Sequence, residues 1–271
     1  MLRFPRGLYS DVRIEEVWST SAGLVLGRLE QFVSRHYTAA FVRVWDGSRW
    51  YYSSTSSIDS IQSELDSLAA MAAPSEAILD DPVVRRLGGN KESRLLFGSD
   101  HVAGVPSRDK LDRLRTSSEP LERRGGLTDR RCHYVDSHKR KKFLSSLGAD
   151  LEFDRQTVLL VAAFETVHGS SRLQESCHVG ARTFGDLPDL VPALEKRLDE
   201  ASEFVRGSKP VDGGRMPVIL SPMAAGIFAH ESFGHKSEAD FMLGDESMLS
   251  EWAVGRRVGS VVEIESATND P

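Results

Sequence analysis

Apolar and polar residues alternate in several segments of the chain, which is the pattern of strands with one buried face. The first such segment covers residues 11–19. Two further segments, residues 39–45 and 48–54, flank the pair Asp46 and Gly47. An Asp-Gly pair supplies the positive φ angles of a tight two-residue turn. These residues therefore predict a β-hairpin near the start of the chain.

Two other segments place apolar residues three and four apart, which brings them onto one face of a helix. The first segment follows Ser57, a residue type that caps helix N-termini. Its apolar positions are Ile58, Ile61, Leu65 and Leu68. The second segment opens at Asp186 and Pro188 and ends before Gly207. Its apolar positions are Leu190, Leu194, Leu198, Ala201 and Phe204. We expect a helix in each segment.

Residues 23–34 allow two interpretations. The apolar residues of this region fit the stripe of an amphipathic helix, and they are Ala22, Val25, Leu26, Leu29 and Phe32. The pair Gly27 and Arg28 fits the turn of a hairpin equally well. Local pattern alone leaves both interpretations open.

The region from about residue 75 to 128 is charged and weakly periodic, and glycine, proline and serine clusters interrupt it. We expect a long variable connection here, with a short exposed helix at residues 110–115. Strand patterns return at residues 141–146, 157–166 and 172–180. The predicted fold class is α+β, with antiparallel β-sheets flanked by helices.

Residues 208–214 form a plausible boundary between two domains, because they are rich in glycine and polar residues. We expect an N-terminal α+β domain over residues 1–208 and the start of a second, metal-binding domain over residues 209–271. The evidence for a metal comes from the motif described below.

The composition is that of an ordinary soluble globular protein, with 271 residues, 40% hydrophobic and 27% charged. A net charge of −6 argues against a nucleic-acid partner. The basic run at residues 139–142 lacks interleaved aromatic residues, and we interpret it as a solvated face rather than a phosphate-binding patch.

No segment has the length and apolarity of a signal peptide or a membrane span, so we expect no membrane association. Cys132 and Cys177 are the two cysteines, and they form no Cys-x-x-Cys pair. A reduced, cytoplasmic location is the corresponding expectation.

The most informative stretch begins with the apolar residues 216–220, which predict a buried strand. Ser221 is suited to be a helix N-cap and Pro222 to be the first helical residue. The predicted helix carries His230, Glu231 and, five residues after the first histidine, His235. Two imidazoles can hold zinc or another divalent transition metal. A carboxylate beside a ligand is placed to take a proton from a water that the metal activates, so Glu231 is the candidate general base.

The spacing of the two histidines is unusual for a helix. Residues five apart lie about 140° around a straight α-helix, so the imidazoles of His230 and His235 would point away from each other. Gly234 offers a remedy, because glycine adopts a left-handed conformation at helix ends without steric cost. We therefore predict that the helix ends or kinks at Gly234 and turns His235 back toward His230.

A single histidine on an apolar helix face is more often a packed core residue than a ligand. Two histidines that bracket a glutamate and a glycine, directly after a Ser-Pro cap, favour a metal site. Glu238 lies three residues after His235 and can serve as a metal ligand or, as we favour, as a carboxylate that orients a histidine. Asp240 is a second candidate for that supporting role. The adjacent pairs Cys132-His133 and Cys177-His178 are superficially similar to metal-binding pairs.

Residues 230–241 resemble the metal-binding helix of the TldD/PmbA family of metallopeptidases, whose members were also labelled modulators of DNA gyrase. Residues 217–226, residues 41–47 and the pair Val254-Gly255 resemble the same family. The resemblance extends over nearly the whole chain and is weak between about residues 75 and 129. It implies strands over residues 23–34 and the TldD-like branch, because PmbA-like subunits lack the histidine pair.

The resemblance implies a peptidase that acts on peptides or unfolded polypeptides and forms homodimers, or heterodimers with a PmbA-like subunit. It implies zinc at His230 and His235, and it places neither Cys-His pair at the site. The third ligand of the family is a cysteine well downstream of the histidines, and family members are considerably longer than this chain. No cysteine follows His235 in this sequence, so residues 209–271 resemble a truncated metallopeptidase domain. The alternative is a catalytically silent fragment or subunit that acts as an assembly partner.

Overall fold

The structure is a computed structural model that describes residues 2–238. The chain divides into two units, Met1–Lys209 (unit 1) and Pro210–Pro271 (unit 2), and each is described by itself. The strands of unit 1 are β1 (Tyr9–Val25), β2 (Arg28–Trp45), β3 (Trp50–Thr55), β4 (Lys91–Arg94), β5 (Leu127–Ser145), β6 (Asp150–His168) and β7 (Ser171–Ala181). Its α-helices are α1 (Ile61–Met71), α2 (Ser107–Arg123) and α3 (Val191–Gly207).

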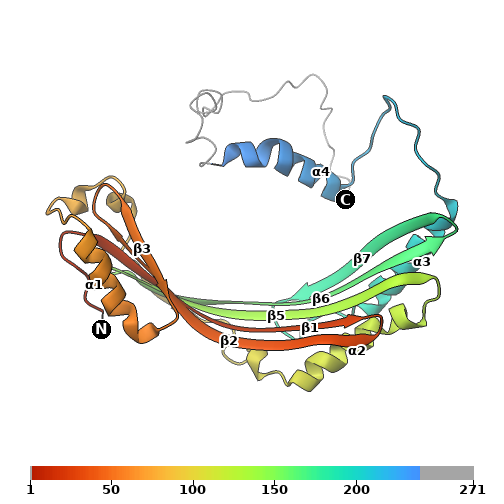
Figure 1. Cartoon of the computed structure of the whole chain (residues 1–271), viewed down its shortest axis with the longest axis horizontal. Helices are drawn as coiled ribbons and strands as arrows, with labels where there is room; N and C mark the ends of the chain where they lie inside the picture. Colours follow the sequence, from red (N-terminus) through yellow and green to blue (C-terminus); the bar gives the residue numbers. More distant parts are fainter. Residues whose placement is uncertain (1, 239–271) are drawn as a thin grey trace. The chain divides into compact units, whose positions relative to one another are not determined.

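Unit 1 is built on one seven-stranded sheet in the order β3-β2-β1-β5-β6-β4, with β7 also paired to β6 (Figure 1). All pairings are antiparallel except the short one between β4 and β6. The α+β class predicted from the sequence is confirmed. The sequence suggested separate sheets, whereas the strands are long enough to run through a single one.

The first hairpin resolves the ambiguity of residues 23–34 in favour of strands. Val25 pairs with Arg28, so β1 and β2 are joined by the two residues Leu26 and Gly27. Both have positive φ, 50° and 78° respectively, as a tight hairpin turn requires. The helical interpretation fails because these apolar residues lie on a pleated strand pair.

The second hairpin is confirmed, but its turn differs from the prediction. Trp45 pairs with Trp50, which leaves a loop of four residues between β2 and β3 rather than a two-residue turn. The carboxylate of Asp46 accepts hydrogen bonds from the backbone N–H groups of Ser48 and Arg49, at 2.8 and 2.9 Å. Asp46 therefore stabilises the loop through hydrogen bonds to its side-chain carboxylate.

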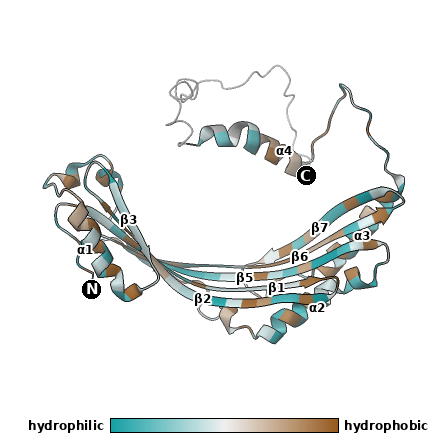
Figure 2. Ribbon diagram, in the orientation of Figure 1, coloured by the Kyte–Doolittle hydropathy of each residue, from teal (hydrophilic) through white to brown (hydrophobic). Residues whose placement is uncertain are grey.

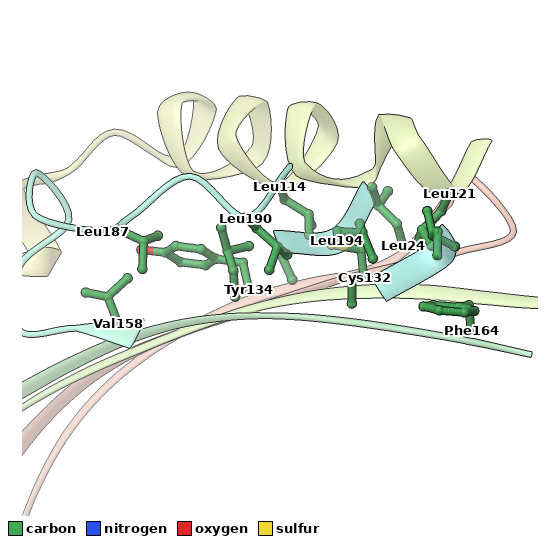
Figure 3. Packing of buried hydrophobic residues seen from close by; sticks show 14 of the residues in the cluster. Leu24, Leu114, Leu121, Cys132, Tyr134, Val158, Phe164, Leu187, Leu190 and Leu194 are labelled. Carbon is green, nitrogen blue, oxygen red and sulfur yellow. The ribbon is translucent and has the colours of Figure 1, made fainter. Parts of the chain in front are cut away.

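The helices pack against two apolar clusters on the sheet. The N-terminal cluster lies under α1 and contains Val12, Val42, Val44, Leu65 and Leu68, among others. The C-terminal cluster lies under α2 and α3, and Figure 3 shows Leu114, Leu121 and Leu194 meeting Cys132, Tyr134 and Phe164. Hydrophobic and polar residues alternate along the strands (Figure 2), so side chains with two-residue spacing share a face. Val12 and Ala22 of β1 lie ten residues apart, so both clusters lie on the same face of the sheet.

The two helices expected from the sequence form, with shifted starts. A short 3-10 turn, Ile58–Ser60, precedes α1, and Ser57 makes no side-chain capping bond. Helix α3 begins at Val191 rather than near residue 186. Its buried side contains Val205, whereas Phe204, which the sequence placed on that side, is 60% exposed.

The short exposed helix expected at residues 110–115 within a long variable connection is longer and more buried than predicted. Helix α2 spans 17 residues there, and its Leu114 and Leu121 are buried in the C-terminal cluster. Its full length and its burial were not predicted because the buried face also contains polar residues, namely Lys110, Ser117 and Ser118. Strand β5 begins at Leu127, 14 residues before the strand predicted at residue 141. Its first half was missed because two of its buried positions are the polar residues Asp136 and His138.

An ion pair joins α2 to the sheet inside unit 1. The Nζ of Lys110 lies 2.6 Å from an Oδ of Asp136, and both side chains are almost completely buried. Asp136 also accepts hydrogen bonds from the Thr20 backbone N–H at 2.9 Å and the Tyr134 hydroxyl at 2.7 Å. Burial raises the pKa of Tyr134, and the negative Asp136 beside it acts in the same direction. The buried charges are therefore paired and hydrogen-bonded, as their burial requires.

The described part of unit 2 consists of a loop, helix α4 (Pro222–Ala229), a π-helical turn (His230–Gly234) and a 3-10 turn (His235–Ser237). The predicted strand at residues 216–220 is absent, and Val218 and Ile219 are 71% and 98% exposed. An apolar run forms a strand only when a partner strand accepts its backbone hydrogen bonds, and residues 210–238 contain none. Within residues 2–238, no helix combines the length and apolarity needed to cross a membrane.

Candidate metal centre

The segment that carries the histidines begins as the sequence predicts. Ser221 has an extended conformation, and its hydroxyl accepts a hydrogen bond from the backbone N–H of Ala224 at 3.3 Å. Pro222 follows as the first helical residue. The Ser-Pro start therefore fixes the first turn of α4, two turns before the histidines.

The helix changes its hydrogen-bonding pattern at His230. Residues His230–Gly234 form a π-helical turn, and the backbone N–H of His235 bonds to the carbonyl of His230. A π turn closes five residues rather than four, so residues five apart lie about one above the other. The imidazole rings of His230 and His235 consequently face each other, with centroids 4.4 Å apart and planes at 64°.

The prediction that Gly234 adopts a left-handed conformation is wrong. Gly234 has φ −60° and ψ −53°, which any residue can adopt, and the π turn achieves the convergence instead. The helical path does change there, because the π turn ends at Gly234 and a 3-10 turn follows. A Cβ at residue 234 would lie 3.5 Å from Nδ1 of His230, so glycine leaves that side of the ring open.

Ser232 belongs to the same turn, although the sequence analysis did not single it out. Its hydroxyl donates a hydrogen bond of 2.6 Å to the carbonyl of Phe228. Serine hydroxyls that bond back to the preceding turn bend helices, and this one does so inside the widened turn. The spacing of five between the histidines was itself the sequence evidence for a π turn, because it matches the i→i+5 hydrogen bond.

Two carboxylates flank His235 in different ways. Glu238 Oε1 lies 2.6 Å from Nδ1 of His235, and Glu231 Oε2 lies 3.7 Å from Nε2 of the same ring. A carboxylate that accepts the proton of Nδ1 leaves the lone pair of Nε2 free for a metal. The geometry therefore supports Glu238 in the orienting role that we favoured.

His230, Glu231 and His235 offer one ligand atom each, and these atoms lie within 4.8 Å of one another. Imidazole nitrogens with a carboxylate oxygen suit zinc and its first-row neighbours, so the donor set fits such an ion. His230 and Glu231 are exposed and His235 is half-buried, so solvent has access to the three side chains. Asp240, the second candidate for a supporting role, lies outside the described residues.

The cysteines belong to a different environment. Cys132 lies on β5 and Cys177 on β7, and both oppose Ala162 of the strand between them. Cys132 is buried in the C-terminal cluster, and burial raises the pKa of its thiol to about 12. Within residues 2–238, the only group of three metal-ligating side chains is that of His230, Glu231 and His235.

Comparison with known proteins gives this geometry a family context. The family model described as PmbA/TldA metallopeptidase domain 1 matches residues 10–73. A metalloprotease of Methanocaldococcus jannaschii is 25% identical over 271 residues, covering 97% of this chain and 59% of the relative. A zinc metalloprotease TldD homolog of Saccharolobus solfataricus is 43% identical over 58 residues, covering 21% of this chain and 12% of the relative.

Solved structures share the fold at low sequence identity. A proposed modulator of DNA gyrase from Bacteroides thetaiotaomicron has a TM-score of 0.67 and 18% identity, covering 87% of this chain and 54% of its own. TldE from Thermococcus kodakarensis has a TM-score of 0.55 and 13% identity, with coverages of 73% and 44%.

These matches relate the chain to proteins described as metallopeptidases. Its similarity is to the TldD/PmbA family, through the first-domain model over residues 10–73 and through the metalloproteases matched at 25% identity. The chain spans 59% of the length of the relative from M. jannaschii and 58% of that of a second archaeal metalloprotease, from Methanothermobacter thermautotrophicus.

Proposed function

We propose that this chain carries the metal-binding segment of a TldD-type peptidase that hydrolyses peptides or unfolded polypeptides. The observation that carries the proposal is the π turn, because it brings two imidazoles and a carboxylate together at a spacing that an α-helix would separate. The names of the relatives, a metalloprotease and a zinc metalloprotease homolog, support a metal-dependent peptidase.

In this proposal each side chain has a separate task. His230 and His235 hold a divalent ion, with zinc as our choice, and Glu238 keeps His235 in the tautomer that binds metal. Glu231 takes a proton from the attacking water and later delivers it to the leaving amine. A bound zinc supplies Lewis-acid activation of the water and of the substrate carbonyl.

The metal ligands in the described residues are fewer than catalytic zinc usually has. Such sites use three protein ligands and keep one position for water, whereas two histidines hold zinc weakly. The third ligand is therefore proposed to come from outside residues 2–238, with the family cysteine as the expected type. A site with only two histidine ligands also fits a second candidate function for the isolated chain, that of a catalytically silent assembly partner.

The proposal extends to partners and location. The likeness to TldE supports assembly with a TldE- or PmbA-like subunit, or with a second copy of this chain. We propose a cytoplasmic location because both cysteines are free thiols, which a reducing compartment maintains.

Zinc binding provides the first test. The 271-residue chain is expected to bind one zinc ion weakly, as isothermal titration calorimetry would measure. His230→Ala and His235→Ala should each weaken binding by more than about 100-fold, since even residues that only orient a ligand are worth 10–100-fold. His178→Ala is the matched control, because His178 is exposed on β7 of unit 1. Unaltered zinc affinity in both site variants would refute the metal site.

The role of Glu238 has a test of its own. Glu238→Ala should lower zinc affinity about 10- to 100-fold, because His235 loses the acceptor that fixes its tautomer. Glu238→Gln keeps an acceptor oxygen and should restore part of this loss. Glu203→Ala on the exposed side of α3 serves as the control. If Gln and Ala at residue 238 both leave the affinity unchanged, Glu238 does not orient the ligand.

A further inference from the structure

None of the α-helices described in unit 1 packs on one face of its sheet, where only the 3-10 turns Ile78–Asp80 and Val84–Arg86 cover the N-terminal end near Tyr9. Helices α2 and α3 cover Tyr134 of β5 and Leu160 of β6, together with residues at even spacing from them. Because side chains alternate along a strand, the residues between these positions project from the opposite face. There Val135 and Leu159 are 41% and 36% exposed. We call this side the open face.

A cationic pocket lies on the open face. It has a volume of ≈ 240 Å³ and is lined by Ser137, Lys139, Lys141, Arg155, Gln156 and Thr157. The strand register places Lys139 beside Arg155 and Ser137 beside Thr157 on adjacent strands. Two neighbouring strands thus present three cations and two hydroxyls to one hollow.

The charges of this pocket are not balanced. Glu15 of β1 is the one carboxylate paired with it in the described part of the chain, at 2.7 Å from the Nζ of Lys141 and 3.8 Å from that of Lys139. The guanidinium of Arg155 is exposed and makes no ion pair there. Three cations therefore face one anion, and the pocket attracts a further negative group.

The other half of the basic run differs. Arg140 and Lys142 project from the opposite face of β5, where they pair with Glu152 at 2.7 Å and Asp150 at 3.6 Å. The interpretation of residues 139–142 as a solvated face fits these two residues. It does not account for the charge that Lys139 and Lys141 contribute to the open face.

Apolar side chains border the pocket along the strands. On β6 the open face presents Phe153, Arg155, Thr157 and Leu159 in succession, and Phe153 and Leu159 are 40% and 36% exposed. These four positions extend over roughly 20 Å at the rise of a strand. A ligand that covers them combines a negative group with apolar groups on both sides.

We propose that the open face binds an extended acidic polypeptide, with one of its carboxylates in the pocket and its apolar side chains on Phe153 and on Val135 with Leu159. Nucleic acid fits less well, because one aromatic ring, Phe153, and the aliphatic Val135 and Leu159 border the cations in place of a row of stacking aromatic rings. This site lies within unit 1 and does not depend on the proposed peptidase function.

The experiment uses the 271-residue chain with Glu231→Gln and a chelator present, so that neither metal nor hydrolysis affects the result. The probe is a fluorescein-labelled peptide of alternating glutamate and leucine, followed by fluorescence anisotropy at low salt. The protein should bind it, and a peptide with glutamine in place of glutamate should bind at least about fivefold more weakly. Inorganic phosphate at millimolar concentration should displace the acidic peptide only partly, because it lacks the apolar contacts.

The variants separate the pocket from general charge. Arg155→Gln should weaken binding about two- to fivefold, and Lys139→Gln with Arg155→Gln about tenfold, which are the sizes expected for exposed charges. Glu15→Gln removes the competing carboxylate and should strengthen binding about two- to fivefold. Arg140→Gln, on the same strand but the opposite face, should leave affinity unchanged.

Three outcomes would overturn the proposal. They are equal binding of the acidic and glutamine peptides, an equal loss in Arg140→Gln and Arg155→Gln, and tighter binding of a single-stranded oligonucleotide than of the acidic peptide. Thermal unfolding of each variant shows that the fold is retained. Loss of zinc binding in unit 2 has no bearing on this result, so the two proposals fail separately.

Discussion

Glu231→Gln is expected to lower metal-dependent peptide hydrolysis about 10²- to 10⁴-fold, the usual contribution of a positioned general base. Glutamine has the same shape but cannot take a proton from water, so the defect should fall on kcat. Zinc affinity should remain within about threefold of the unaltered protein, because the histidines are the proposed ligands. The measurement is hydrolysis of a quenched fluorescent polypeptide by the protein, or by its complex with a TldE-like subunit, together with zinc content.

Two results would change this assignment. If Glu231→Gln loses zinc along with activity, the carboxylate is a third ligand rather than the base, which its 3.7 Å distance from His235 allows. If the unaltered protein binds zinc but hydrolyses nothing, alone or in complex, the silent assembly partner becomes the better hypothesis. Unchanged hydrolysis in Glu231→Gln would exclude the proposed mechanism.

Lys110→Met is expected to destabilise unit 1 by about 3–5 kcal/mol, because it leaves the buried carboxylate of Asp136 without its cation. Urea unfolding followed by circular dichroism would measure the loss. Lys110→Met with Asp136→Asn should recover much of it, since the neutral amide retains an oxygen that can accept from Thr20.

Arg108→Met on the same helix is the matched control. Arg108 forms an exposed pair with Asp112, at 3.5 Å, which is worth about 0.5 kcal/mol or less. Similar losses in Lys110→Met and Arg108→Met would show that the buried pair has no special role in stability.

The parts of the fold that the sequence predicted are those where local pattern and packing agree. The hairpin at Asp46 and helix α1 have strong turn residues and a clear apolar stripe, and both form. Helix α2 was predicted only as a short exposed helix, because tertiary pairing buries Lys110, a residue that periodicity counts as exposed. At residues 216–220 a strand was predicted and none forms, because apolar residues without a partner strand do not become a strand.

The candidate site was predicted in its residues but not in its backbone geometry. The chemistry of His230, Glu231 and His235 follows from their side chains, and the two imidazoles were expected to converge through a reversal at Gly234 in spite of their spacing. The π turn was not predicted, because residues 230–234 were expected to form an α-helix that ends or kinks at Gly234. A π turn makes residues five apart neighbours without any exceptional dihedral angle.

The single sheet of unit 1 has a consequence for its folding cooperativity. Strand β1 contributes Val12 to the cluster under α1 and Ala22 to the cluster under α2 and α3, so both clusters share its ladders with β2 and β5. Neither end can lose its strand pairing without straining the ladder of the other. The helices at the two ends are thereby coupled into one melting unit, although their side chains belong to separate cores.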